Sequence, residues 1–145
     1  MASVWPPRPV NADWRDAALA GDVARLEALL DGGADIDALD RYGQSGLMIA
    51  AMHGNVDVAR FLIERGAALD HTAKYRLSAL MLAVINGHVE IVRLLVHAGA
   101  DRELRGSGAP GFHDKTARDL AAAVEREDLL EALGSVPPGL EAPRR

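Results

Sequence analysis

Apolar residues between positions 78 and 99 fall into two short blocks, and each block ends at a glycine. Ser78 precedes the first block and can cap a helix, because its hydroxyl accepts a hydrogen bond from a free backbone N–H. This block ends at Asn86-Gly87, where glycine adopts the left-handed conformation at little cost. The second block runs from about residue 89 to 97 and ends at Gly99. The pattern therefore predicts two short helices whose apolar faces require a neighbour of the same kind.

The same pattern recurs earlier in the chain with a fixed period. Gly21, Gly54 and Gly87 are equally spaced and define this period. At the same offset the matching pairs are Ser45/Ser78, Leu47/Leu80, Met48/Met81, Ala50/Ala83, Val56/Val89, Arg60/Arg93, Leu62/Leu95, Gly66/Gly99 and Ala67/Ala100. Units that repeat in this way bury their apolar faces by stacking on their neighbours.

A period of about 33 residues, with a turn and two helices in each unit, resembles the ankyrin repeat family. The segments that carry the resemblance are Ala50-Ala51-Met52-His53-Gly54, residues 87–95 and Gly33-Ala34-Asp35-Ile36-Asp37. The resemblance implies an all-α solenoid, in which helix-turn-helix units stack and β-hairpin fingers project roughly at right angles. Where the family has Thr-Pro-Leu-His, this chain has Ser-Gly-Leu-Met at 45–48 and Ser-Ala-Leu-Met at 78–81. We expect serine still to cap the helix, and methionine packing to replace the polar bond of the histidine.

The repeat divides the chain into one domain and two flanking segments. We expect a Pro-rich N-terminal arm (1–11), an ankyrin domain (12–134) with repeats at about 12–38, 39–72, 73–105 and 106–134, and a flexible C-terminal tail (135–145). Trp14 stands where Leu47 and Leu80 stand, so it is expected to plug the open end of the core. Arg25 stands where Val58 and Ile91 stand, which indicates an end repeat that faces water.

The fourth repeat differs from the two before it. Thr116 follows Ser78 by five positions more than one period, so its finger has been lengthened within segment 106–111, which is flexible by composition. Glu125 replaces the turn glycine, and Glu127 replaces the valine of the earlier repeats. A more polar outer face indicates a C-terminal cap.

The composition excludes several classes of protein. The 145-residue chain is 49% hydrophobic and has no cysteine, which rules out disulfides and thiolate sites. Its net charge of −5 argues against general affinity for nucleic acid, and no apolar run approaches the length of a membrane span. We expect a soluble, cytoplasmic monomer with neither a nucleic-acid nor a membrane partner.

Patterns of catalytic and metal-binding residues are also missing. The five histidines show no HxxxH or HxxE spacing, and segment 106–111 lacks the Lys-Ser/Thr of a phosphate loop. The resemblance implies a structural role, in finger hydrogen bonds, for the carboxylates Asp35, Asp37, Asp70 and Asp101. We therefore expect a chain that is not an enzyme and needs no cofactor or metal.

The resemblance implies that a protein partner contacts the finger tips and the exposed side of each first helix. The repeat phase assigns to this surface three residues from each finger and two from each later helix: Arg41, Tyr42 and Gln44; Lys74, Tyr75 and Leu77; Phe112, His113 and Lys115; Met52 and His53; Ile85 and Asn86; Ala123 and Val124. Both tyrosines and one of the two phenylalanines fall at finger tips, each beside a basic or imidazole side chain. Tyrosine and arginine are enriched at interface hot spots, so we predict a partner with an acidic surface.

Alternatives remain open for these residues and for the function. The rings could instead pack on neighbouring fingers and stiffen them. Met48 and Met81 are expected to be half-buried between the first helices rather than to form a methionine-rich binding surface. The leading function is a non-catalytic adaptor or inhibitor. The alternatives are a self-associating scaffold and a regulator similar to the four-repeat inhibitors of cyclin-dependent kinases, although those inhibitors have a shortened helix where residues 45–53 are full length.

Overall fold

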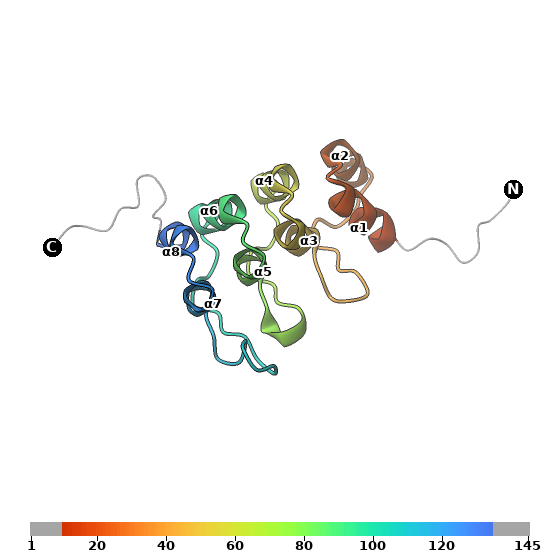
Figure 1. Ribbon diagram of the computed structural model, residues 1–145. Coiled ribbons are helices and arrows are strands. Elements are labelled where there is room, and N and C mark those ends of the chain that lie inside the picture. The colour runs from red at the N-terminus through yellow and green to blue at the C-terminus, as the bar shows by residue number, and fades with distance from the viewer. Residues whose placement is uncertain (1–9, 135–145) are drawn as a thin grey trace, which may run out of the picture.

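The computed structural model describes residues 10–134 (Figure 1). Within this range it contains eight α-helices, one short 3-10 turn and no strand. The elements are α1 (Val10–Ala20), α2 (Val23–Asp31), α3 (Gly46–His53), α4 (Val56–Glu64), η1 (Lys74–Arg76), α5 (Ala79–Ile85), α6 (Val89–Ala98), α7 (Ala117–Ala123) and α8 (Glu127–Leu133). α1 begins inside the segment assigned to the N-terminal arm. Residues 1–9 of that arm and the predicted tail 135–145 lie outside the described residues.

The helices pair and stack side by side in two layers (Figure 1). The first helices of the pairs, α1, α3, α5 and α7, form one layer, and the second helices, α2, α4, α6 and α8, form the other. Each helix contacts both its pair partner and at least one neighbouring helix in its own layer. The predicted all-α repeat stack is therefore confirmed.

Three loops, which we call fingers, extend from the side of the first helices (Figure 1). They are residues 32–45, 65–78 and 99–116. In the first two, a single antiparallel bridge joins Leu39 to Ser45 and Thr72 to Ser78. The expected β-hairpins are thus reduced to loops closed by one bridge. The physical reason is that each bridging serine is also a helix N-cap, so the chain turns into a helix before a strand can continue.

Side-chain caps fix the beginning of three first helices. The hydroxyls of Ser45 and Ser78 accept hydrogen bonds from the backbone N–H groups three residues later, at 3.2 and 3.3 Å. Thr116 does the same for α7, where Asp119 also accepts a hydrogen bond from the Thr116 backbone N–H. This reciprocal arrangement is a capping box, which satisfies two free N–H groups at once. The capping predicted for Ser45 and Ser78 is confirmed.

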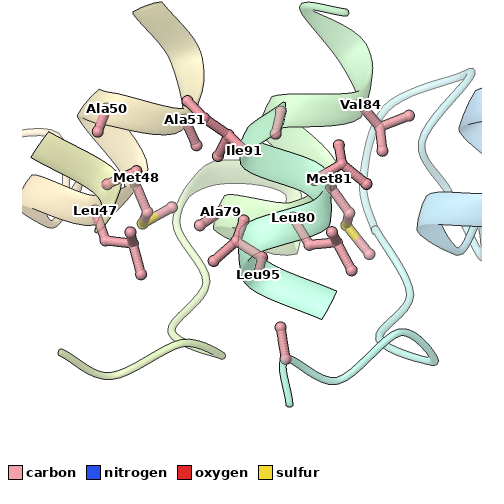
Figure 2. Packing of buried hydrophobic residues seen from close by; sticks show 14 of the residues in the cluster. Leu47, Met48, Ala50, Ala51, Ala79, Leu80, Met81, Val84, Ile91 and Leu95 are labelled. Carbon is pink, nitrogen blue, oxygen red and sulfur yellow. The ribbon is translucent and has the colours of Figure 1, made fainter. Parts of the chain in front are cut away.

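The core lies between the layers and runs through the whole stack. Figure 2 shows the part of it around α3, α5 and α6. Trp14 is 2% exposed and fills the space at the first-repeat end, as predicted, whereas Arg25 is exposed. The expectation of half-buried methionines is wrong, because Met48 and Met81 are each only 1% exposed. Each lies on a first helix that is covered on both sides by the neighbouring first helices and also by its own pair partner. They therefore offer no binding surface.

Carboxylates at the finger bases form hydrogen bonds, as the resemblance implied, and two of these bonds join neighbouring fingers. Asp37 accepts a hydrogen bond from the Ala68 backbone N–H at 2.8 Å, and Asp70 accepts one from the Asp101 backbone N–H at 2.7 Å. Each of these bonds links residues 31 positions apart, which is close to one repeat. The acidic residues therefore hold successive fingers in a fixed spacing.

Backbone hydrogen bonds hold the third finger, although the composition of segment 106–111 favours flexibility. Gly106 donates its backbone N–H to the Lys115 carbonyl, and Asp114 donates its own to the Gly106 carbonyl, at 3.0 and 2.9 Å. Ser107 donates to the carbonyl of Tyr75 in the second finger at 2.8 Å. Composition alone indicated flexibility because it could not include these backbone bonds to distant residues.

Candidate functional site

The first finger presents an exposed tyrosine that two arginines contact. Tyr42 is 59% exposed, and the guanidinium carbons of Arg15 and Arg41 each lie 5.6 Å from the centre of its ring. A cation over an aromatic face is attracted by the electron-rich face of the ring. The two arginines therefore restrict the orientation of the most exposed aromatic side chain in the described residues.

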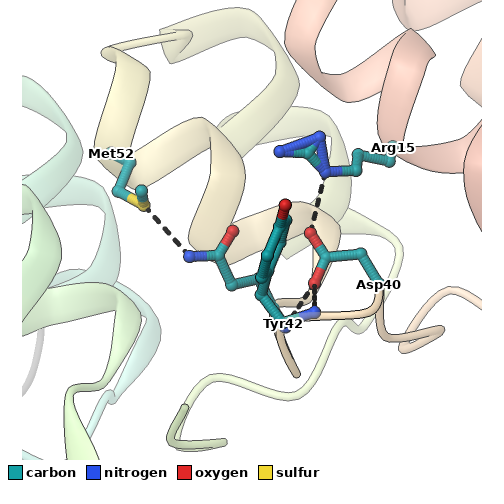
Figure 3. A network of polar contacts seen from close by, with 5 residues as sticks. Arg15, Asp40, Tyr42 and Met52 are labelled. Carbon is teal, nitrogen blue, oxygen red and sulfur yellow. Dashed lines mark hydrogen bonds and ion pairs between the residues drawn. The ribbon is translucent and has the colours of Figure 1, made fainter. Parts of the chain in front are cut away.

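Asp40 fixes the backbone beneath this ring (Figure 3). Its carboxylate accepts hydrogen bonds from the backbone N–H groups of Tyr42 and Gln44, both at 2.9 Å. It also forms an ion pair with Arg15 of α1, in which the Nε–H donates at 2.9 Å. The Asp40 side chain is only 4% exposed. It is occupied by these internal bonds and holds the finger tip against α1.

The finger surface continues onto the first helix of the same repeat. The Gln44 amide nitrogen lies 3.5 Å from the thioether sulfur of Met52, near the end of α3 (Figure 3). Leu19, Met52 and Ile85 occupy equivalent positions in three successive first helices. Leu19 is 36% and Ile85 37% exposed, while Met52 is half-buried. We call these three side chains, near the ends of α1, α3 and α5, the apolar stripe.

The tips of the second and third fingers contact each other. The rings of Tyr75 and Phe112 lie 5.8 Å apart between centroids and are tilted by 37°. Tyr75 is 36% exposed, Phe112 is half-buried, and the Lys74 ammonium lies 4.9 Å from the centre of the tyrosine ring. These two rings have the packing expected if they stiffen the fingers, while part of Tyr75 still faces solvent.

The other predicted contact residues divide by exposure. Leu77 is 7% exposed and lies in the core, so it cannot form part of a contact surface. It directly precedes the buried helix cap Ser78, where the finger has already turned inward. Seven of the remaining predicted residues are exposed: His53, Ile85, Asn86, His113, Lys115, Ala123 and Val124.

Two surface residues escaped the sequence prediction, namely Arg15 and Leu19. Leu19 could have been found, because it precedes Met52 by one full period of the repeat. Arg15 aligns in the same way with the buried Met48, so its phase indicated the core. It is instead half-exposed, because no earlier repeat covers α1 in the described part of the chain.

The finger edge carries cations in an acidic chain. Arg41, Lys74, Arg76 and Lys115 are all exposed. None of them has a carboxylate within 4.0 Å in the part of the chain that the structure describes, whereas Arg105 pairs with Asp114 at 3.6 Å. These four cations are therefore available to groups outside the chain.

Neither a metal site nor a membrane-spanning helix is found among the described residues. Between residues 10 and 134, no group of three or more His, Asp or Glu side chains is placed to hold a metal ion. In the same range, none of the helices has both the length and the apolar character needed to cross a bilayer. Hydrogen bonds from the Thr116 backbone N–H and hydroxyl lower the pKa of the Asp119 carboxyl.

Comparison with known proteins gives a family. No curated protein sequence matches this chain. The family model for three copies of the ankyrin repeat matches residues 15–105, which is more than half of the chain. Ankyrin repeats are generally protein–protein interaction modules and are typically non-catalytic. The matched segment contains the helices α2 to α6 and most of α1, and the helix pair α7–α8 extends the same stack. The chain therefore belongs to the ankyrin repeat family.

Proposed function

We propose that this chain is a non-catalytic protein-binding module, which acts as an adaptor or as an inhibitor that covers part of its partner. The observation that carries the proposal is the exposed ring of Tyr42, which Arg15 and Arg41 hold in place. Tyrosine and arginine are the side chains enriched at interface hot spots. A ring that is already oriented loses less conformational freedom on binding, which favours affinity.

Further side chains beside Tyr42 would let the contact face engage more than one side chain of a partner. Through Gln44 it is continuous with Met52, and from there the apolar stripe extends to Leu19 and Ile85. Exposed apolar residues that line up next to polar ones are typical of protein interaction sites. The proposed contact face is therefore formed by the fingers together with the exposed side of the first helices.

Charge favours an acidic partner. The exposed cations at the finger tips, among them Arg41 and Lys74, would attract a negative surface and would disfavour a positive one. The end repeats carry exposed polar residues, such as Arg25 and Glu127, at positions where the inner repeats are apolar. This supports a monomer, and the proposal places its action in the cytoplasm.

The test is affinity capture from a lysate of the native cells, with bound proteins identified by mass spectrometry. Wild type is compared with Tyr42→Ala and with Arg93→Ala, which changes an exposed residue on α6 in the opposite layer. Truncation of a hot-spot tyrosine costs about 2 kcal/mol or more, which is roughly a 30-fold loss of affinity. We expect one or more proteins that wild type and Arg93→Ala retain and Tyr42→Ala loses.

Other outcomes would contradict the proposal in distinguishable ways. A protein that Tyr42→Ala retains and Arg93→Ala loses would move the binding face to the second helices. If wild type retains no protein above the level of empty resin, the chain is not a binding module for that proteome. Circular dichroism of each variant checks that the helical stack is intact.

A further inference from the structure

The tip of the second finger has an unfavourable backbone conformation. Tyr75 and Arg76 follow each other in the left-handed region, with φ of 62° and 55°. Side chains with a Cβ adopt this region rarely. The residue one period before Arg76 is Gly43, which has φ of 75° in the first finger. An arginine thus stands where the related finger uses a glycine.

Contacts from the longer third finger hold this conformation. Ser107 donates its backbone N–H to the Tyr75 carbonyl at 2.8 Å, and the Phe112 ring packs on the Tyr75 ring at 5.8 Å. Gly108 has φ of 79°, and a Cβ at that position would lie 3.3 Å from the tyrosine Cδ1. The residues added to the third finger therefore pack closely against the strained tip.

The braced tip combines charge with an aromatic surface. Lys74 lies over the Tyr75 ring at 4.9 Å, Arg76 is exposed next to it, and Lys115 is exposed in the third finger. The Lys115 backbone N–H donates to the Phe112 carbonyl at 3.1 Å, so Lys115 belongs to the same turn of the third finger as the second ring. Strained backbone persists where surrounding contacts enforce it, and such positions cluster at functional sites.

We propose that the second and third fingers together form one anion-recognition site for an acidic peptide segment of the partner. Lys74, Arg76 and Lys115 bind carboxylates of that segment, and an apolar or aromatic side chain beside them packs on Tyr75. The site takes a short acidic segment rather than a nucleic acid, because the cations lie only in the two fingers. The chain as a whole has a net charge of −5, which repels a polyanion that extends beyond them. This inference rests on the proposed function, whose partner chemistry it specifies.

The test begins with random peptides displayed on phage and selected on the immobilised full chain. We expect the selected peptides to be rich in Asp and Glu next to an aromatic or aliphatic residue. The most enriched peptide is then synthesised with a fluorescent label, and its affinity is measured by fluorescence anisotropy. Replacing each of its acidic residues by the corresponding amide should abolish binding, and raising the salt concentration should weaken it.

Arg76→Gly is the decisive variant, because it removes the cation and also relieves the left-handed strain. Losing a hydrogen bond between charged partners should weaken peptide binding by about 10-fold or more. The same variant should unfold at an equal or higher temperature than wild type, since glycine accepts this conformation freely. A fall in affinity without a fall in stability cannot come from unfolding. Arg93→Ala serves as the control for removal of an exposed arginine elsewhere.

A second variant tests the contact between Phe112 and Tyr75. Phe112→Leu keeps all three cations but removes the ring that packs on Tyr75. It should therefore lower the affinity for the peptide by a smaller factor than Arg76→Gly does. The inference is overturned if wild type selects no peptides, if the amide peptide binds equally well, or if Arg76→Gly binds like wild type. Equal affinity for a labelled single-stranded oligonucleotide would also overturn it. The lysate capture with Tyr42→Ala decides the proposed function separately.

Discussion

Gly54 and Gly66 provide a matched pair for testing how successive repeats are joined. Both are left-handed, with φ of 75° and 85°. A Cβ at Gly54 would lie 2.7 Å from His88 Cε1 and 2.8 Å from its Nδ1, whereas a Cβ at Gly66 would meet nothing within 4 Å. The His88 Nε2–H donates to the Met52 carbonyl at 3.1 Å, so this ring connects the turn of the third repeat to the end of α3.

The expected decreases in the free energy of unfolding follow from these contacts. Alanine in the left-handed region costs about 1 kcal/mol, and both Gly54→Ala and Gly66→Ala incur this cost. Only Gly54→Ala must also displace His88 and its hydrogen bond, which adds roughly 1–2 kcal/mol of steric and polar cost. We therefore expect losses of about 1 kcal/mol at Gly66 and about 2–3 kcal/mol at Gly54. Gly54→Val, with a β-branched side chain, should cost at least as much as Gly54→Ala.

Urea unfolding followed by circular dichroism measures these losses. Each alanine variant is made in wild type and in a His88→Ala background. Without the imidazole the added methyl meets no ring, so Gly54→Ala should then cost the same as Gly66→Ala, about 1 kcal/mol. Two results would refute the reasoning: equal losses in wild type, or a difference that survives the removal of His88.

Two further predictions concern the ends of the stack. Gly46→Ala should destabilise by about 1–2 kcal/mol in urea unfolding, because its Cβ would lie 2.7 Å from the buried Trp14 Nε1. In a Trp14→Phe background the loss should largely disappear, and an undiminished loss would contradict the contact. The lowered pKa of Asp119 stabilises the fold above the ordinary value of 3.8, and this stabilisation is lost as the pH falls through the lower folded value. Between about pH 5 and about pH 2, Asp119→Asn should therefore lose less thermal stability than wild type, and equal losses would count against the capping box.

The repeat phase predicts the helices well because it follows contacts that every unit must make. A residue that faces the next repeat has the same surroundings in each unit, so Ser45 and Ser78 cap in the same way. The same logic placed Trp14 in the core and Arg25 in solvent. Stacking enforces these positions, and a single sequence is enough to find them.

The exposed fraction of a side chain is harder to predict than the side of the helix or finger on which it lies. The phase placed Met48 and Met81 between the first helices but could not show that neighbours cover both sides completely. Leu77 was assigned to the surface by the repeat phase, as the counterpart of Gln44, although the leucine turns inward. How far a side chain is covered depends on the exact path of the chain around it, which the pattern of apolar residues does not specify.

The finger tips depend on contacts that are not shared between repeats. Asp40 holds the first tip, but the residue one period later is Ala73, which has no carboxylate to offer. The second tip relies on Ser107 and Phe112, which belong to the enlarged third finger. Tyr42 and Tyr75 are therefore equivalent in sequence but differ in exposure, at 59% and 36%. Contacts that recur in every repeat build the stack, whereas contacts found in only one repeat shape each finger tip. Partner specificity should therefore depend on the residues that differ between the tips. Exchanging residues between the two tips should then change binding without unfolding the stack.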